Sequence, residues 1–194
     1  MLLNIPNILT LARIAAIPLF VIAYYMPQSW ANDAAAGLFI MAAVTDWLDG
    51  YLARKWNQVS PFGAFLDPVA DKLMVAAALI LLVADPQNQA ISISPMALSV
   101  VTIVILGREI TISALREWMA ELGKRSSVAV SFVGKLKTTA QMAAIPVMLV
   151  GDLTWFGHPC FRTGEVLLYI AAALTLWSML AYLKAAWPVL KGQS

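Results

Sequence analysis

The chain has 194 residues, of which 61% are hydrophobic and 12% are charged, and its mean hydropathy is +0.77. Soluble domains average about 45–50% apolar and about 25% charged residues, so this composition excludes a water-soluble enzyme, a secreted disulfide scaffold and a disordered chain as first interpretations. A net charge of +2 is too small to indicate a nucleic-acid partner, and the single cysteine, Cys160, excludes an intrachain disulfide and a cysteine-based metal site. The composition predicts one integral membrane domain covering residues 1–194.

Six apolar segments are long enough to cross a bilayer, which requires about 20 mostly apolar residues in a helix. They cover residues 8–26, 33–54, 67–85, 93–118, 135–151 and 164–187. Helix-breaking residues separate them at Pro27, Pro61, Pro86, Gly123 and Gly157. The sequence therefore predicts an all-α integral membrane bundle of six transmembrane helices joined by short connections.

The lysines and arginines near the segment ends predict the orientation of this bundle. Nine of them follow the second and fourth segments or lie close to the C-terminus: Arg54, Lys55, Arg116, Lys124, Arg125, Lys135, Lys137, Lys184 and Lys191. The other three connections contain only Arg162. This bias predicts that the N- and C-termini are cytoplasmic, which would place His158 and Cys160 on the outer side.

Four aspartates lie at the predicted cytoplasmic ends of the second and third segments: Asp46, Asp49, Asp67 and Asp71. An aspartate at the centre of a membrane costs about 2.5–3.5 kcal/mol on translocon-derived scales, and such residues usually face a cavity and have a partner. The i, i+3 spacing of the first two and the i, i+4 spacing of the last two place each pair on one helical face. Two antiparallel helices could thus direct all four carboxylates into one cleft, where two Mg²⁺ or Mn²⁺ ions would balance their charge.

Small residues and an arginine extend these two faces. Gly50, Ala53 and Arg54 continue the face of the first two aspartates, and Gly63 precedes Asp67 by one helical turn. The small residues leave room for a ligand close to the backbone, and the arginine offers a planar fork for a phosphate.

Purely structural explanations of the same residues are also open. Asp67 followed by Pro68 is typical of an N-cap and a first-turn proline. The first two aspartates could form buried ion pairs with Arg54 or Lys72. The glycines could serve only the packing of one helix against another.

Written in order, the segment reads Asp46-x-x-Asp49-Gly50-x-x-Ala53-Arg54, eight residues, then Gly63-x-x-x-Asp67-x-x-x-Asp71. It matches, position for position, the signature of the CDP-alcohol phosphotransferase family, and the chain resembles this family beyond the signature. The opening stretch from Asn4 to Arg13 and the stretch from Arg108 to Gln141 are similar to those of bacterial members that use sn-glycerol 3-phosphate as acceptor. The similarity is weak in residues 85–95 and 151–165.

The resemblance implies a six-helix enzyme of the bacterial cytoplasmic (inner) membrane, homodimeric, with a cytoplasm-facing site that holds two Mg²⁺ or Mn²⁺ ions. All four aspartates of the signature would be metal ligands, and Asp71 would also be the general base. CDP-diacylglycerol would contact Gly50, Ala53, Arg54, Ser60, Gly63, Asn7, Thr10 and Arg13. The implied reaction of anionic phospholipid biosynthesis transfers the phosphatidyl group from this lipid to sn-glycerol 3-phosphate and releases CMP.

The acceptor carries a phosphate dianion that the aspartates cannot neutralise. The candidates for binding it are Arg108, Arg116, Lys135, Thr138 and Thr139. Arg108 is the strongest of them because it lies inside an apolar segment, where an arginine is costly without a partner, although a pair with Glu109 is the alternative explanation. The neighbouring Lys124, Arg125 and Lys137 could instead serve only to set the topology and attract anionic lipid.

Two other functions are compatible with the same pattern. One is a family member with a different acceptor alcohol, because the signature does not specify the acceptor. The other is a divalent-cation transporter that uses the aspartates as a transit site. A transporter would need polar residues along the spans toward the outer side, whereas the ionisable residues here gather at the cytoplasmic ends.

Overall fold

The structure is a computed structural model of the chain, and it describes residues 4–56, 60–122, 132–150, 154–155 and 158–190. Within these ranges, the helices of at least 18 residues are α1 (Ile5–Tyr24), α2 (Ala31–Lys55), α3 (Pro61–Ala84), α5 (Pro95–Glu121), α6 (Phe132–Leu149) and α7 (Cys160–Leu190). The connections contain the short helix α4 (Pro86–Ile91) and an antiparallel pair of two-residue strands, β1 (Thr154–Trp155) and β2 (His158–Pro159). The helical fold class is confirmed, and the strand pair was not predicted.

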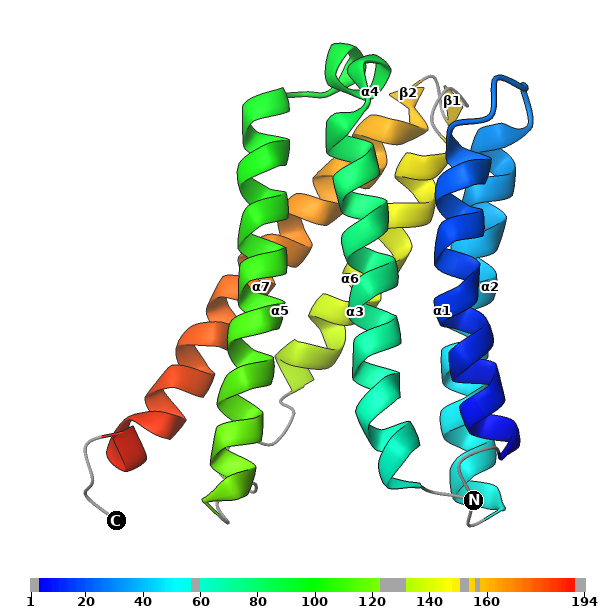
Figure 1. The fold of residues 1–194 in the computed structure, drawn as a ribbon. Coiled ribbons are helices and arrows are strands. Elements are labelled where there is room, and N and C mark those ends of the chain that lie inside the picture. The colour runs from blue at the N-terminus through cyan, green and yellow to red at the C-terminus, as the bar shows by residue number, and fades with distance from the viewer. Residues whose placement is uncertain (1–3, 57–59, 123–131, 151–153, 156–157, 191–194) are drawn as a thin grey trace.

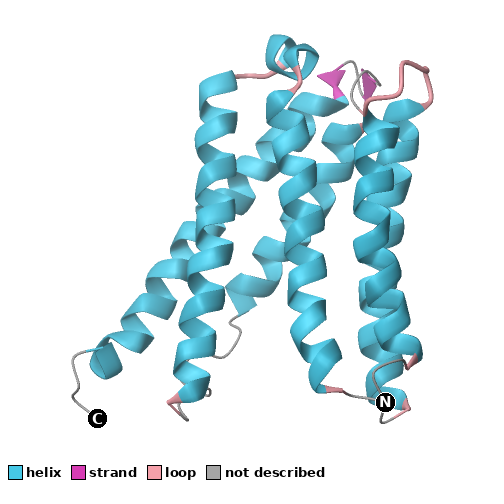
Figure 2. Cartoon of the chain, in the orientation of Figure 1, coloured by secondary structure: helices cyan, strands magenta, loops and turns pink. Residues whose placement is uncertain are grey.

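The long helices lie side by side as a bundle (Figures 1 and 2). Helix α1 packs against α2 and α3, while α7 packs against α5 and α6. Helix α1 begins and α7 ends at one end of the bundle, and α4 with the two strands lies at the opposite end (Figure 1). We call these the terminal end and the far end.

Helix α3 begins earlier than the sequence predicted. Ser60 is its N-cap, and the Ser60 hydroxyl accepts a hydrogen bond from the Gly63 amide at 3.0 Å. Pro61 follows as the first helical residue, and Pro68 lies inside the helix. The interpretation of Asp67 as an N-cap is therefore wrong, and its carboxylate is left for other contacts.

The predicted break at Asp85-Pro86 contains a short helix. The Asp85 side chain accepts a hydrogen bond from the Gln87 amide at 2.8 Å, and Pro86 occupies the first position of α4. The same pair of residues therefore ends α3 and starts α4, because proline at the first helical position has no amide to satisfy.

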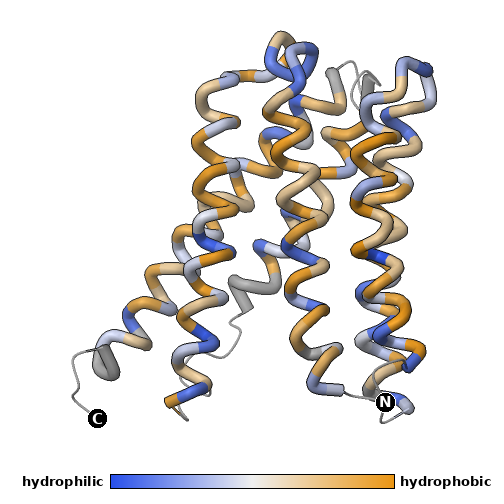
Figure 3. Tube along the Cα trace, viewed as in Figure 1, coloured by the Kyte–Doolittle hydropathy of each residue, from blue (hydrophilic) through white to orange (hydrophobic). Residues whose placement is uncertain are grey.

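Three helices are long and apolar enough to cross a membrane by length and composition: α1, α5 and the Cys160–Lys184 part of α7. Many large apolar side chains face outward, including Met96, Ile103 and Trp177, which are 78%, 69% and 70% exposed. Hydrophobic residues dominate much of the long helices, and hydrophilic ones interrupt them in the half nearer the terminal end (Figure 3). Such an apolar outer surface is what lipid contact requires.

A continuous apolar core joins the long helices. Its largest fully buried side chains come from α1, α2, α3, α5 and α6, with Phe161 and Leu168 from α7. Phe20 of α1 and Phe39 of α2 lie with their ring centres 6.5 Å apart. This core holds the helices at the spacing that positions the polar residues described below.

Buried polar contacts tie the elements together at the far end. Glu165 of α7 is fully buried and accepts hydrogen bonds from the Ser92 hydroxyl at 2.6 Å, the Ile93 amide at 2.8 Å and the Tyr169 hydroxyl at 2.5 Å. One carboxylate thereby fixes the connection between α4 and α5 to the start of α7.

A second tie at this end joins α1 to the start of α4. The Tyr24 hydroxyl donates to the Asp85 carboxylate at 2.9 Å and accepts from the Asn88 amide nitrogen at 2.8 Å. Together with the Glu165 contacts, it attaches the two connections on either side of α4 to α1 and α7.

Gly164 allows α7 to approach α6 closely. A Cβ at this position would lie 2.5 Å from Met148 Cγ and 2.8 Å from the Ala144 carbonyl oxygen, so backbone would have to move. By contrast, a Cβ at Gly37 of α2 would meet no atom within 4 Å.

We expect Gly164→Ala to lower the free energy of unfolding in detergent by about 1–3 kcal/mol, because it overpacks a close helix contact. Gly37→Ala is the matched control and should be neutral or stabilising by up to about 1 kcal/mol, since alanine favours the helix. Denaturant titration of both variants measures the difference. Equal effects of the two substitutions would show that the α6–α7 contact does not need glycine.

Candidate active site

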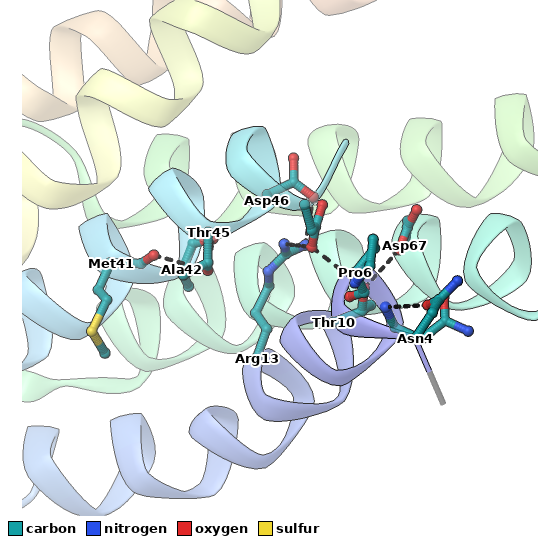
Figure 4. Close-up of polar contacts among 11 residues, drawn as sticks. Asn4, Pro6, Thr10, Arg13, Met41, Ala42, Thr45, Asp46 and Asp67 are labelled. Carbon is teal, nitrogen blue, oxygen red and sulfur yellow. Dashed lines mark hydrogen bonds and ion pairs between the residues drawn. The ribbon is translucent and has the colours of Figure 1, made fainter. Parts of the chain in front are cut away.

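Arg13 of α1 forms two ion pairs with the aspartates of α2. Its guanidinium lies 2.5 Å from Asp46 Oδ1 and 2.6 Å from Asp49 Oδ2, as Figure 4 shows for the labelled Arg13 and Asp46. The side chains of Arg13 and Asp49 are 1% and 3% exposed, whereas that of Asp46 is 42% exposed. The expected alternative partner Lys72 instead contacts the Ser113 hydroxyl of α5. The counter-charge for these two carboxylates therefore comes from α1.

Thr10, one turn before Arg13, brings the aspartates of α2 and α3 together. Its buried hydroxyl lies 2.8 Å from Asp67 Oδ1 and 3.3 Å from Asp49 Oδ2, and 3.1 Å from the Pro6 carbonyl oxygen (Figure 4). Because one hydroxyl reaches both carboxylates, the two helices place Asp49 and Asp67 next to each other. We call Asp46, Asp49 and Asp67, with Thr10 and Arg13, the aspartate patch. The predicted convergence of aspartates from the two helices is borne out at this pair.

Asp71 lies between this patch and a larger pocket. It lines a small cavity of about 10 Å³ together with Arg13 and Asp46. It also lines a pocket of about 350 Å³ between α3, α5 and α6. The polar side chains around that pocket are Asp71, Lys72, Glu109, Lys137, Thr138 and Gln141, and the apolar ones include Val75, Ala76, Ile80, Leu106, Ile110 and Met142.

The aspartates suit a hard cation in donor type and in charge. Four carboxylates lie on adjacent helices, and Arg13 is their counter-ion among the described ion pairs, so negative charge is in excess. Within the part of the chain that the structure describes, no three His, Cys, Asp or Glu side chains form a ready metal site, and Arg13 takes oxygens of two of the carboxylates. The assignment of Asp46, Asp49, Asp67 and Asp71 as metal ligands stays a prediction that the oxygen-only donor set supports.

Three other predicted site residues meet where α1 and α3 begin. The Ser60 hydroxyl donates to Asn7 Oδ1 at 3.0 Å, and Asn7 is buried. A Cβ on Gly63 would lie 2.5 Å from the same Asn7 oxygen. The packing explanation for Gly63 is thus confirmed, and the close approach it permits also places Asn7 and Ser60 beside the aspartate patch.

On α2, Gly50 and Ala53 are half-buried and follow the aspartates toward the end of the helix. Arg54 lies in the last turns of α2 and Lys135 near the start of α6, and the side chains of both lie outside the described part of the structure. Their predicted roles in phosphate binding stay predictions.

The arginine predicted to bind the acceptor has protein partners. Arg108 Nη1 lies 3.0 Å from Glu109 Oε1, and Arg108 Nη2 donates to the Ser178 hydroxyl at 3.0 Å. The alternative explanation, a pair with Glu109, is therefore confirmed. Arg108 also lies over the Tyr182 ring, 5.7 Å from its centre, and does not line the pocket that contains Asp71.

Lys137 lines that pocket, and the sequence left its role open. It is 3% exposed and contacts the same Glu109 oxygen that accepts from Arg108. Gln141, one turn later on α6, is also buried and lines the pocket. Their i, i+4 spacing, which places both on one face of α6 just before its apolar part, is the signal that could have identified them.

Of the remaining residues predicted to bind the acceptor, the fold brings one to the pocket and leaves two outside it. Both threonines, Thr138 and Thr139, are exposed, but only Thr138 lines the pocket with Lys137. Arg116 donates to the Tyr182 hydroxyl at 2.7 Å and lies 5.0 Å from the centre of that ring. It is therefore held against α7, away from Asp71.

We expect Arg13→Met to lower the free energy of unfolding by about 3–5 kcal/mol, because it leaves the buried Asp49 carboxylate without its counter-ion. Denaturant titration in detergent with a chelator present measures the loss. Arg162→Met is the control, since Arg162 is exposed and donates through Nε to the Ile91 carbonyl oxygen at 2.9 Å. If the two variants lose the same stability, the Arg13 ion pairs contribute nothing specific.

Residues 3–177 match the CDP-alcohol phosphatidyltransferase family. Relatives from Escherichia coli strain K12, Escherichia coli O157:H7 and Shigella flexneri serotype 5b are each 54% identical over 183 residues, which is 94% of this chain and 94% of the relative. Each of these relatives is named CDP-diacylglycerol–glycerol-3-phosphate 3-phosphatidyltransferase. The matched region contains every described contact of the aspartate patch, and the chain belongs to the CDP-alcohol phosphatidyltransferase family.

Proposed function

We propose that this protein transfers the phosphatidyl group of CDP-diacylglycerol to sn-glycerol 3-phosphate, giving phosphatidylglycerophosphate and CMP. The names and near-complete coverage of its relatives support this reaction. The observation that carries it is the position of Asp71, which borders both the aspartate patch with Arg13 and the pocket that contains Lys137. A nucleotide lipid and a phosphorylated alcohol must meet at one carboxylate, and Asp71 is placed between an anionic and a cation-bearing surface.

In this reaction the 1-hydroxyl oxygen of glycerol phosphate forms a bond to the phosphorus that carries the diacylglycerol. The bond from that phosphorus to the oxygen of the CMP phosphate breaks, and CMP leaves with the electron pair. Asp71 takes the proton of the attacking hydroxyl as general base. Phosphoryl transfer depends mainly on positioning and charge, which suits a site built of fixed carboxylates and cations.

Asp46, Asp49, Asp67 and Asp71 would hold two Mg²⁺ or Mn²⁺ ions. When bound, such ions neutralise the diphosphate and the leaving oxygen. Thr10 and Arg13 keep the carboxylates of α2 and α3 together through their hydrogen bonds. The ends of α1 and α3, joined through Asn7 and Ser60, and the small residues of α2 would border the cytidine diphosphate.

We further propose that the six long helices are six spans, with both termini and the site on the cytoplasmic side of the bacterial inner membrane. Three observations support this topology. Helix α1 begins and α7 ends at the same end of the bundle (Figure 1). Asp46 and Asp49 lie toward the end of α2 and Asp67 near the start of α3, on the side of that end. In the sequence, lysines and arginines concentrate after α2, after α5 and near the C-terminus. The bacterial origin of the relatives supports the location. A homodimer is the family expectation and stays a prediction.

Purified protein with CDP-diacylglycerol, Mg²⁺ and sn-glycerol 3-phosphate should release CMP, and a chelator should abolish the release. Asp71→Asn should lower kcat by about a hundredfold or more, because it removes the general base. Asp33→Asn, in the first turn of α2 at the far end and exposed, should leave the rate unchanged.

Competing acceptors separate the alternatives. Release of CMP with serine or inositol phosphate but not with glycerol phosphate would keep the family and overturn the acceptor. No release with any acceptor from folded protein would overturn the enzymatic proposal, and metal uptake into sealed vesicles would then test transport.

A further inference from the structure

A continuous chain of polar contacts runs from α7 through α5 to the pocket at α6. Ser178 accepts from Arg108 at 3.0 Å, Arg108 donates to Glu109 at 3.0 Å, and Glu109 contacts the ammonium of Lys137. The side chains of Arg108 and Lys137 are 6% and 4% exposed, and that of Glu109 is 24% exposed. Glu109 and Lys137 line the pocket with Asp71, whereas Arg108 does not line it.

The charges of Arg108, Glu109 and Lys137 do not cancel. Two buried cations share a single carboxylate oxygen, Glu109 Oε1, so the group carries one positive charge in excess. A pair of Glu109 and Lys137 alone would be neutral and would offer an anion little attraction. Because Arg108 also pairs with Glu109, the three side chains together keep one positive charge, and Lys137 brings it to a pocket that Asp71 and Lys72 also line.

The hydrogen-bond donors of Lys137 also favour an anionic ligand in the pocket. An ammonium has three hydrogens, and Glu109 takes one of those on Lys137 in the described contacts. Lys137 itself lines the pocket, so its ammonium can donate to a ligand there, and Thr138 lines the same pocket. A phosphate in this pocket would lie next to Asp71, the carboxylate that borders the aspartate patch.

We propose that Glu109 is a positioning residue that holds the Lys137 ammonium toward the phosphate of the acceptor in the pocket beside Asp71. This inference rests on the proposed function, because the acceptor is taken to be a phosphorylated alcohol. Arg108 is the anchor of Glu109 rather than a ligand of the acceptor, and Ser178 fixes Arg108 to α7. The group thus selects for an acceptor that carries a phosphate.

Steady-state kinetics with CDP-diacylglycerol and sn-glycerol 3-phosphate test the proposal. Glu109→Gln should raise the KM for glycerol phosphate by about tenfold and leave the KM for the lipid within about twofold. The kcat should change much less than the KM for glycerol phosphate, because Asp71 is untouched. Glu117→Gln is the matched control: it removes the same charge from an exposed position of the same helix.

A double-mutant cycle with Lys137→Met separates positioning from a general contribution to the fold. If Glu109 acts through Lys137, Glu109→Gln should add no further increase in the KM for glycerol phosphate once Lys137 is replaced. A merely structural role would make the two effects multiply and would lower kcat and both affinities together. Multiplying effects on the KM for glycerol phosphate, or a joint loss of kcat and of both affinities, would each overturn the proposal.

Glu109→Asp keeps the charge on a side chain shorter by one methylene and serves if the glutamine variant does not fold. It should give a KM for glycerol phosphate between those of the unaltered protein and the glutamine variant. If only the aspartate variant folds, its KM for glycerol phosphate should be higher than that of the unaltered protein. A KM equal to that of the unaltered protein overturns the proposal. Failure of the proposed function is recognised separately, since the unaltered protein would then release no CMP with glycerol phosphate.

Discussion

The buried contact between Arg13 and two aspartates is the constraint on which the rest of the site depends. It joins the first helix to the second through charges that are nearly inaccessible to solvent on the Arg13 and Asp49 sides. Breaking such a pair on one side costs about 3–5 kcal/mol, which is a large part of the stability of a typical protein. Thr10, one turn earlier, extends the same attachment to the third helix through Asp67. The first helix is therefore the element that keeps the carboxylates of its two neighbours together.

The two halves of the site have opposite imbalances of charge. Around Arg13, carboxylates outnumber the cation that neutralises them, and around Glu109, cations outnumber the carboxylate. A buried imbalance is costly in isolation, and each is relieved by a ligand of the opposite sign. The first suits divalent cations, which in the proposed reaction would bind the diphosphate of the lipid, and the second suits the phosphate of the acceptor. The two substrates would then bind on different sides of the site. Asp71 lies where the two regions meet.

Much of this arrangement follows from local properties of the sequence. Apolar segments of membrane-spanning length located the long helices, and the spacing of Asp46, Asp49 and Asp67 indicated that they share faces. The start of α3 could not be predicted in the same way, because Ser60-Pro61 and Asp67-Pro68 carry the same capping signal and only the packing against α1 favours the first. The burial of Lys137 was also beyond the sequence, since it depends on how α5 and α6 pack.

The polar ties at the far end have a consequence for the membrane around the protein. Glu165 and Tyr24 hold the connections there, while Asp46 and Asp49 lie toward the end of α2 and Asp67 lies near the start of α3, on the side of the terminal end. With the proposed topology, the headgroup chemistry of such an enzyme would be confined to one leaflet. It would draw its lipid from that leaflet and return the product to it, so newly made anionic lipid would reach the opposite leaflet only by a separate translocation step.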